Sequence, residues 1–150
     1  MKLIEHDPDI GGRFSIFSNT SLIPGFHFNS DLCKNFLEGG REAMEEKGLA
    51  EDLANQLNQS MKNNKNIASY LIYGHELLEV GNWKRQLFAE SLGKNGKGFM
   101  PVVSEMTKDQ HSILQLFLDG PKNVFFEIMS MESDKAVSYT HLRAHETCEN

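Results

Sequence analysis

Two side chains on one predicted helix have the types and spacing for acid–base chemistry. At about 100° per residue, Glu90 falls on one stripe with three apolar residues, Val80, Trp83 and Leu87. A carboxylate on an apolar face is costly unless it is paired or protonated, and burial raises the pKa of a carboxyl group toward neutrality. Such a group suits a general base for a carbon-bound proton. Gln86 lies one turn earlier on the same side and could hydrogen-bond a hydroxyl of a substrate. The alternative for Glu90 is a place at the rim of the helix, paired with Arg85 or a lysine.

Two further residues could take part. His111 is predicted in the first turn of a helix, where the positive end of the helix dipole favours the neutral, proton-accepting imidazole. A packed or solvent-facing histidine held by Asp109 is the alternative. Arg13 follows the pair Gly11-Gly12, where the backbone can approach a ligand closely. A surface salt bridge is the alternative for that arginine.

Other motifs give weaker signals. The loop GKNGKG (Gly93 to Gly98) invites a phosphate-binding interpretation, but Phe99 stands where the P-loop pattern requires lysine. A basic turn that ends a helix explains this loop equally well. The six histidines show no metal-ligand spacing, no GxSxG elbow is present, and Cys33 lies in a predicted helix without a histidine partner in view. We therefore predict no metal site and find no support for nucleophilic catalysis.

Predicted helices and strands alternate along the chain. Helical spacing of apolar residues predicts four helices, from the cap Ser30-Asp31 toward Gly48 and over residues 49–62, 78–92 and 109–118. Short apolar runs predict three strands, over residues 67–73, 99–103 and 124–129. Residues 10–23 form an element of unassigned type, which Pro24-Gly25 is expected to end. Strands separated by helices favour an α/β fold with a parallel sheet.

Composition excludes several classes of protein. The chain has 150 residues, of which 39% are hydrophobic and 24% charged, which suits one globular domain and not a disordered, collagen-like or disulfide-rich chain. The formal net charge of −6 and the absence of Lys/Arg-rich runs argue against nucleic-acid binding. No window approaches the roughly 20 apolar residues of a membrane span, and the first residues lack the apolar segment of a secretory signal. We expect a cytoplasmic protein.

The last residues stand apart from the rest. The run VSYTHLRAHET (Val137 to Thr147) resembles, letter for letter, one reading frame through a transposase-type sequencing adapter. We expect natural sequence to stop near Ala136, so that residues 137–150 are a non-native tail and the chain is part of a longer protein. A natural polar tail is the alternative.

Three long motifs in register resemble the glucose-6-phosphate isomerase family. They are GGRFSIFSN (Gly11 to Asn19), WKRQLFAESLGKNGKG (Trp83 to Gly98) and DQHSILQLFLDGPK (Asp109 to Lys122), and the resemblance covers nearly all of residues 5–130. It implies an aldose–ketose isomerase that interconverts glucose 6-phosphate and fructose 6-phosphate through a cis-enediol, without a metal or organic cofactor. Lys84 departs from the family pattern, in which an aromatic residue is common at this place.

The resemblance also implies roles for individual residues. Glu90 would move the proton between carbons 1 and 2, and Arg13 would stabilise the enediolate charge. Gln86 and Gly12 would contact substrate. His111 would help to open the sugar ring and would come from the neighbouring subunit of a homodimer. The phosphate-binding Ser/Thr-rich loop and a C-terminal lysine of the family lie outside this chain, so we expect the chain alone to lack isomerase activity.

The fold implied is the three-layer α/β/α sugar-isomerase (SIS) type with a parallel sheet, incomplete in this chain. Residues 1–136 would form the central segment of an isomerase, with the start of its second SIS domain. Two alternatives remain at this point: a non-catalytic sugar-phosphate-binding module of the same fold, and an isomerase for a different phosphosugar. Retention of the base together with Arg13, Gln86 and His111 favours the enzyme, because a pure binder needs no base over carbon 2.

Overall fold

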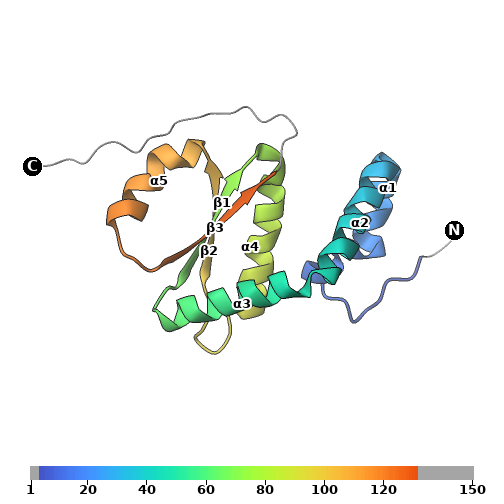
Figure 1. The fold of residues 1–150 in the computed structure, drawn as a ribbon. Helices are drawn as coiled ribbons and strands as arrows, with labels where there is room; N and C mark the ends of the chain where they lie inside the picture. Colours follow the sequence, from blue (N-terminus) through green and yellow to red (C-terminus); the bar gives the residue numbers. More distant parts are fainter. Residues whose placement is uncertain (1–3, 132–150) are drawn as a thin grey trace, which may run out of the picture.

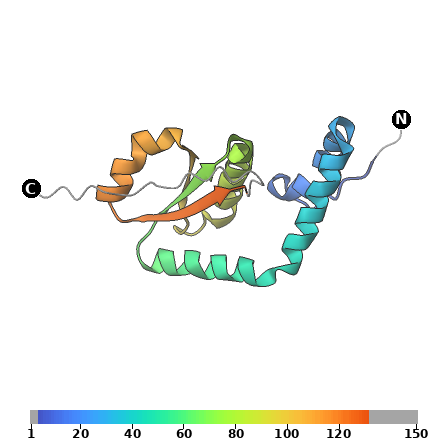
Figure 2. The same ribbon diagram turned by 45° about the horizontal axis from the view of Figure 1, so that its top comes forward.

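The chain folds around a small parallel sheet (Figures 1 and 2), seen in a computed structural model that describes residues 4–131. The sheet has the order β2-β1-β3, with β1 at Ile67–Tyr73, β2 at Met100–Met106 and β3 at Val124–Ser130. Both neighbours run parallel to β1. The predicted α/β class with a parallel sheet is therefore confirmed, whereas the adapter-like run lies outside the described residues.

Helices cover both faces of this sheet. Helix α4 (Leu78–Leu92) connects β1 to β2, and α5 (Lys108–Asp119) connects β2 to β3 on the far side of β1. Because right-handed crossovers in opposite directions fall on opposite faces, the two helices lie on either side of the sheet, as Figure 1 shows. Edge-to-face aromatic pairs mark the two faces: Tyr70 meets Phe88 of α4, and Phe126 meets Phe117 of α5.

The core lies between the sheet and the helices α3 (Lys47–Lys62) and α4. Its buried apolar members are Leu57, Ala68, Tyr70, Ile72 and Phe99. Strand β1 supplies three of them, because it is the central strand and these alternate residues point to the face that α4 covers. Gly81 lets α4 approach this core, since a Cβ atom there would lie 3.0 Å from Ile72 Cδ1.

Strand β2 is longer than predicted. The prediction ended the strand at residue 103, because polar residues follow the apolar run. In the structure Ser104, Glu105 and Met106 continue the ladder opposite Leu71, Ile72 and Tyr73. Pairing with the central strand overrides the polar pattern, and the Ser104 side chain is buried in the process. The short helix η2 (His75–Leu77) then links β1 to α4.

The N-terminal part forms a separate helical layer (Figure 2). It consists of η1 (Gly12–Phe17), α1 (Asn19–Phe28) and α2 (Ser30–Glu45). The predicted stop at Pro24-Gly25 is wrong, since α1 continues to Phe28 with Pro24 inside it. Proline removes one backbone donor, but Asn29 N–H still bonds to Gly25 O at 2.9 Å and α1 packs against α2. The α2 cap is Asn29 rather than Ser30-Asp31: its side chain accepts from two backbone N–H groups.

Much apolar surface remains uncovered in residues 4–131. Leu116 and Leu118 of α5 and Ile128 of β3 are each at least 59% exposed. Strands β2 and β3 each pair on one side only within the described part of the chain. None of the described helices combines the length and the apolar character needed to cross a membrane.

A cluster of polar groups is buried on the α4 face of the sheet. The Lys84 ammonium group bonds to Glu127 Oε1 and lies 5.1 Å from the centre of the Tyr70 ring. Lys84 and Glu127 have side chains that are only 15% and 19% exposed. Glu127 Oε2 and the Tyr70 hydroxyl make no hydrogen bond within residues 4–131. Burial, and secondarily the Glu127 carboxylate, raise the pKa of Tyr70 well above its usual range.

Replacement of Tyr70 by phenylalanine tests this cluster. Because its hydroxyl is buried without a partner among residues 4–131, Tyr70→Phe should leave the free energy of unfolding at pH 7 unchanged or raise it by up to about 1 kcal/mol. In the folded state Tyr70 keeps its proton at a pH where the unfolded chain loses it. This difference in proton binding leaves the free energy of unfolding unchanged below about pH 10. Above that pH the unfolded chain loses the Tyr70 proton first, so the folded protein loses stability as the pH rises further.

Urea unfolding at pH 7 and above pH 10 measures both effects. We expect the variant to lose less stability than the parent chain at alkaline pH. Tyr73→Phe, at a residue that is 39% exposed, is the matched control and should change stability at pH 7 by less than about 0.5 kcal/mol. A destabilisation of more than about 1 kcal/mol at pH 7 would mean that the Tyr70 hydroxyl has a partner after all.

Candidate active site

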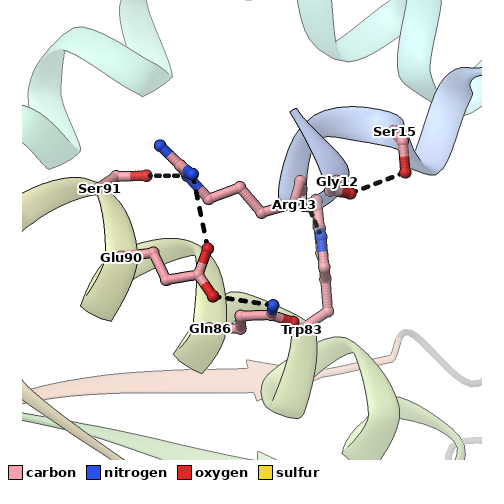
Figure 3. A network of polar contacts seen from close by, with 7 residues as sticks. All are labelled: Gly12, Arg13, Ser15, Trp83, Gln86, Glu90 and Ser91. Carbon is pink, nitrogen blue, oxygen red and sulfur yellow. Dashed lines mark hydrogen bonds and ion pairs between the residues drawn. The ribbon is translucent and has the colours of Figure 1, made fainter. Parts of the chain in front are cut away.

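The predicted site residues Arg13, Gln86 and Glu90 lie together where η1 meets the last two turns of α4 (Figure 3). Arg13 reaches from η1 across to α4, where Gln86 and Glu90 lie one turn apart. Residues 77 positions apart in the sequence thus share one polar network.

The Glu90 carboxylate is held by two donors. Gln86 Nε2 donates to Oε1 at 3.0 Å, and Arg13 Nη1 lies 3.5 Å from Oε2. The first contact follows from helix geometry, since residues four apart face each other on a helix. The second depends on the packing of η1 against α4. Together they orient the carboxylate, and they put an amide and a cation beside any group that approaches it.

Arg13 is fixed by two residues that sequence reasoning did not assign to the site. Its Nε donates to Ser91 Oγ at 3.0 Å, and its backbone carbonyl accepts a hydrogen bond from Trp83 Nε1 at 3.2 Å. Its second terminal nitrogen, Nη2, makes no hydrogen bond to any other described residue, which leaves a donor free for a ligand. Ser91 directly follows Glu90, and Trp83 lies on the Glu90 stripe, so position alone could have pointed to both.

Glu90 differs from the prediction in its environment. Its side chain is 47% exposed, so the predicted burial on an apolar face is wrong. The reason is that Val80, which shares the stripe, is itself 44% exposed and the stripe faces a thin N-terminal layer instead of the core. The alternative partners Arg85 and lysine are also wrong, because the cation beside Glu90 is Arg13.

The two remaining predicted residues do not join the network. Gly12 accepts a hydrogen bond from Ser15 Oγ at 2.7 Å and would have no atom within 4 Å of an added Cβ. His111 is exposed in the first turn of α5 and makes no contact with Glu90. Glu90 precedes β2 and His111 follows it, and a strand of seven residues spans roughly 20 Å. The alternative contact between Asp109 and His111 is not among the described contacts. The Asp109 carboxylate instead accepts a hydrogen bond from the Glu105 backbone N–H.

Within residues 4–131, no three His, Cys, Asp or Glu side chains gather closely enough to hold a metal ion. The donors at the site are an amide, a guanidinium and a hydroxyl. What these groups can do is bind a polar, oxygen-rich ligand and move a proton at the one carboxylate.

Comparison with known proteins finds relatives among the isomerases. The glucose-6-phosphate isomerase of Methanocaldococcus jannaschii is 38% identical over 129 residues, which cover 81% of this chain and 32% of that protein. The glucose-6-phosphate isomerase of Rubrobacter xylanophilus is 35% identical over 130 residues, covering 83% of this chain and 30% of that protein. The chain is related to one segment of the glucose-6-phosphate isomerases. No protein-family model matches the chain.

The chain spans about a third of the length of the curated isomerases that it matches. Among solved structures, a hypothetical protein from Thermus thermophilus aligns with a TM-score of 0.69 and 28% identity, covering 81% of this chain and 31% of that one. The similarity to the isomerases therefore concerns one segment of those proteins.

Proposed function

We propose that this chain is the central segment of an aldose–ketose isomerase that interconverts glucose 6-phosphate and fructose 6-phosphate, a step of glycolysis and gluconeogenesis in the cytoplasm. The observation that carries the proposal is the Glu90 carboxylate, fixed between the Gln86 amide and the Arg13 guanidinium. The names of the related proteins support the substrate class. Residues 1–136 would be the isomerase segment and residues 137–150 the non-native tail.

In the proposed mechanism Glu90 is the base. Its carboxylate takes the proton from carbon 2 of the open-chain aldose, and the electrons of that bond form the double bond of a cis-enediolate with its charge on O1. A proton moves from the O2 hydroxyl to O1 through the cis-enediol, and the proton held by Glu90 then returns to carbon 1 to give the ketose. The half-exposed setting of Glu90 leaves one side of the carboxylate open to a substrate. No cofactor enters this scheme.

Arg13 would stabilise the negative charge that develops on the enediolate oxygens. A cation aimed at developing charge is the usual source of such stabilisation, and Nη2 is the donor free for it. Gln86 and the Gly12 backbone would contact substrate hydroxyls. Both residues lie at or beside the network in Figure 3.

His111 would assist ring opening from a second subunit. The separation of Glu90 and His111 by the length of β2 supports this role, because one chain of this fold does not bring the two together. We propose a homodimer in which each active site combines Glu90 of one subunit with a histidine at the place of His111 from its partner.

A chimera tests the proposal. Residues 4–131 replace the matching segment of the Methanocaldococcus jannaschii relative, and formation of fructose 6-phosphate from glucose 6-phosphate is measured. We expect turnover by the folded chimera and none by the isolated chain. A folded chimera that binds the sugar phosphate without converting it would support the non-catalytic alternative. Turnover of mannose 6-phosphate in preference to glucose 6-phosphate would support the other isomerase class.

A further inference from the structure

A basic cleft lies at the amino edge of the sheet, and none of its lining residues belongs to the network of Arg13, Gln86 and Glu90. It has a volume of about 560 Å³ and is formed by the end of α3, the turn before β1 and the loop before β2. The residues that line it are Asn58, Met61, Lys62, Asn64, Lys65, Asn66, Gly96, Lys97 and Gly98. Three are lysines, three are asparagines, and none carries a carboxylate.

The parallel topology gathers these lysines. Because parallel strands begin at the same edge of a sheet, the segments that lead into them lie side by side. Asn66 ties the segments together: its N–H bonds to Asn123 O at 3.0 Å, and its carbonyl accepts from Met100 N–H at 2.7 Å. The loop before β2 therefore meets the turn before β1, which brings Lys97 to the same cleft as Lys65.

The turn Asn95-Gly96 sets the position of Lys97. Both residues have positive φ, 55° and 70°, and Lys97 N–H bonds to Lys94 O at 3.0 Å. This two-residue hairpin pairs Lys94 with Lys97 across the turn. Like charges at directly opposite positions repel each other, which raises the free energy of the loop. A bound anion would reduce this repulsion.

The three cleft lysines lack an acidic partner within residues 4–131, as do Lys94 and Lys122. Lys34, Lys84 and Lys108 each form an ion pair with a carboxylate. Lys62, Lys65 and Lys97 form none within residues 4–131, although the whole chain has a net charge of −6. Three uncompensated cations in one cleft of an acidic protein are the feature that the proposed isomerase chemistry leaves unexplained.

We propose that this cleft binds a small phosphate-type polyanion of the size of a diphosphate. Lysine ammonium groups serve phosphate as point charges, and asparagine amides add neutral donors. The volume exceeds what a single phosphate fills, and no aromatic ring lines the cleft to stack on a base. The loop follows a helix and precedes a strand, the reverse of a P-loop, so side chains and not a helix N-terminus supply the binding. The site does not depend on the proposed isomerase activity.

Titration of the purified chain with inorganic pyrophosphate tests this site, by calorimetry or by phosphorus NMR at low salt. We expect binding that weakens roughly tenfold for each cleft lysine removed, as in Lys65→Gln and Lys97→Gln combined. The matched control is Lys34→Gln combined with Lys108→Gln, which removes the same net charge at exposed positions and should bind pyrophosphate nearly as the parent chain does.

A second measurement locates the pyrophosphate-binding site on the chain and needs little soluble protein. Pyrophosphate should slow acetylation of Lys62, Lys65 and Lys97, read by mass spectrometry, and leave Lys34 and Lys108 unchanged. Equal weakening in the two double variants, uniform protection of all lysines, or no binding at about 10 mM pyrophosphate would overturn the proposal. Sulfate at equal ionic strength should bind more weakly because it carries less charge, and equal affinity would refute a phosphate-type site.

Discussion

Glu90→Gln in the active chimera is expected to lower kcat for glucose 6-phosphate by about 10²- to 10⁴-fold, the contribution of a positioned general base. The amide has the same size and still accepts a hydrogen bond from Arg13, so the network keeps its shape while the proton acceptor is lost. KM should change far less than kcat, because Gln86 and Arg13 still contact the substrate.

The control for this variant lies on the same helix. Glu79 is exposed in the first turn of α4 and accepts only a 3.4 Å contact from Asn82, so Glu79→Gln should leave kcat nearly unchanged. Steady-state kinetics and solvent deuterium exchange into carbon 2 measure both variants. A Glu90→Gln chimera that keeps most of its turnover would exclude Glu90 as the base.

Lys84→Met is expected to produce the largest loss of stability, about 3 kcal/mol in the free energy of unfolding. The change leaves the Glu127 carboxylate largely buried beside Tyr70 with no cation, and Glu127 Oε2 already lacks a partner within the described residues. A domain of this size has a total stability of only about 5–15 kcal/mol, so the loss should be visible in any urea or thermal unfolding curve.

A double-mutant cycle separates the pair from the packing around it. Glu127→Leu combined with Lys84→Met removes both charges and should recover most of the loss, because apolar groups of similar volume replace a buried ion pair at little cost. The exposed pair Lys34–Asp31 is the matched control, and Lys34→Met should cost less than about 0.5 kcal/mol. If Lys84→Met were as mild as Lys34→Met, solvent would have to reach the Glu127 carboxylate.

The contacts of Lys84 could not be predicted from the sequence. Lys84 looked like a minor departure at a place where an aromatic residue is common. In the structure it packs its charge over the Tyr70 and Phe88 rings and bonds to Glu127 of β3. No periodicity links residue 84 to residue 127, because the contact forms only once α4 packs on the face of the sheet from which the Glu127 side chain of β3 projects.

Local patterns predicted the local structure well. The run IASYLIY of β1 and the helix over residues 78–92 have the predicted bounds, since their apolar spacing and flanking turns are properties of a few neighbouring residues. The pair Gln86 and Glu90 follows from the helical repeat in the same way. Where β2 ended depended instead on its pairing with β1, and α1 continued past Pro24 because it packs against α2.

The chemistry of the candidate site divides along the same line. Residue types and motifs pointed to Arg13, Gln86 and Glu90 without any coordinates. Tertiary packing supplied the rest: it brought Arg13 to Glu90, fixed Arg13 through Ser91 and Trp83, left Glu90 half exposed and set His111 beyond the far end of β2. The physical reason is that residue spacing determines contacts within one or two helical turns, whereas the contacts of Arg13 with Glu90 and Trp83 form only when segments some 70 or more residues apart pack together.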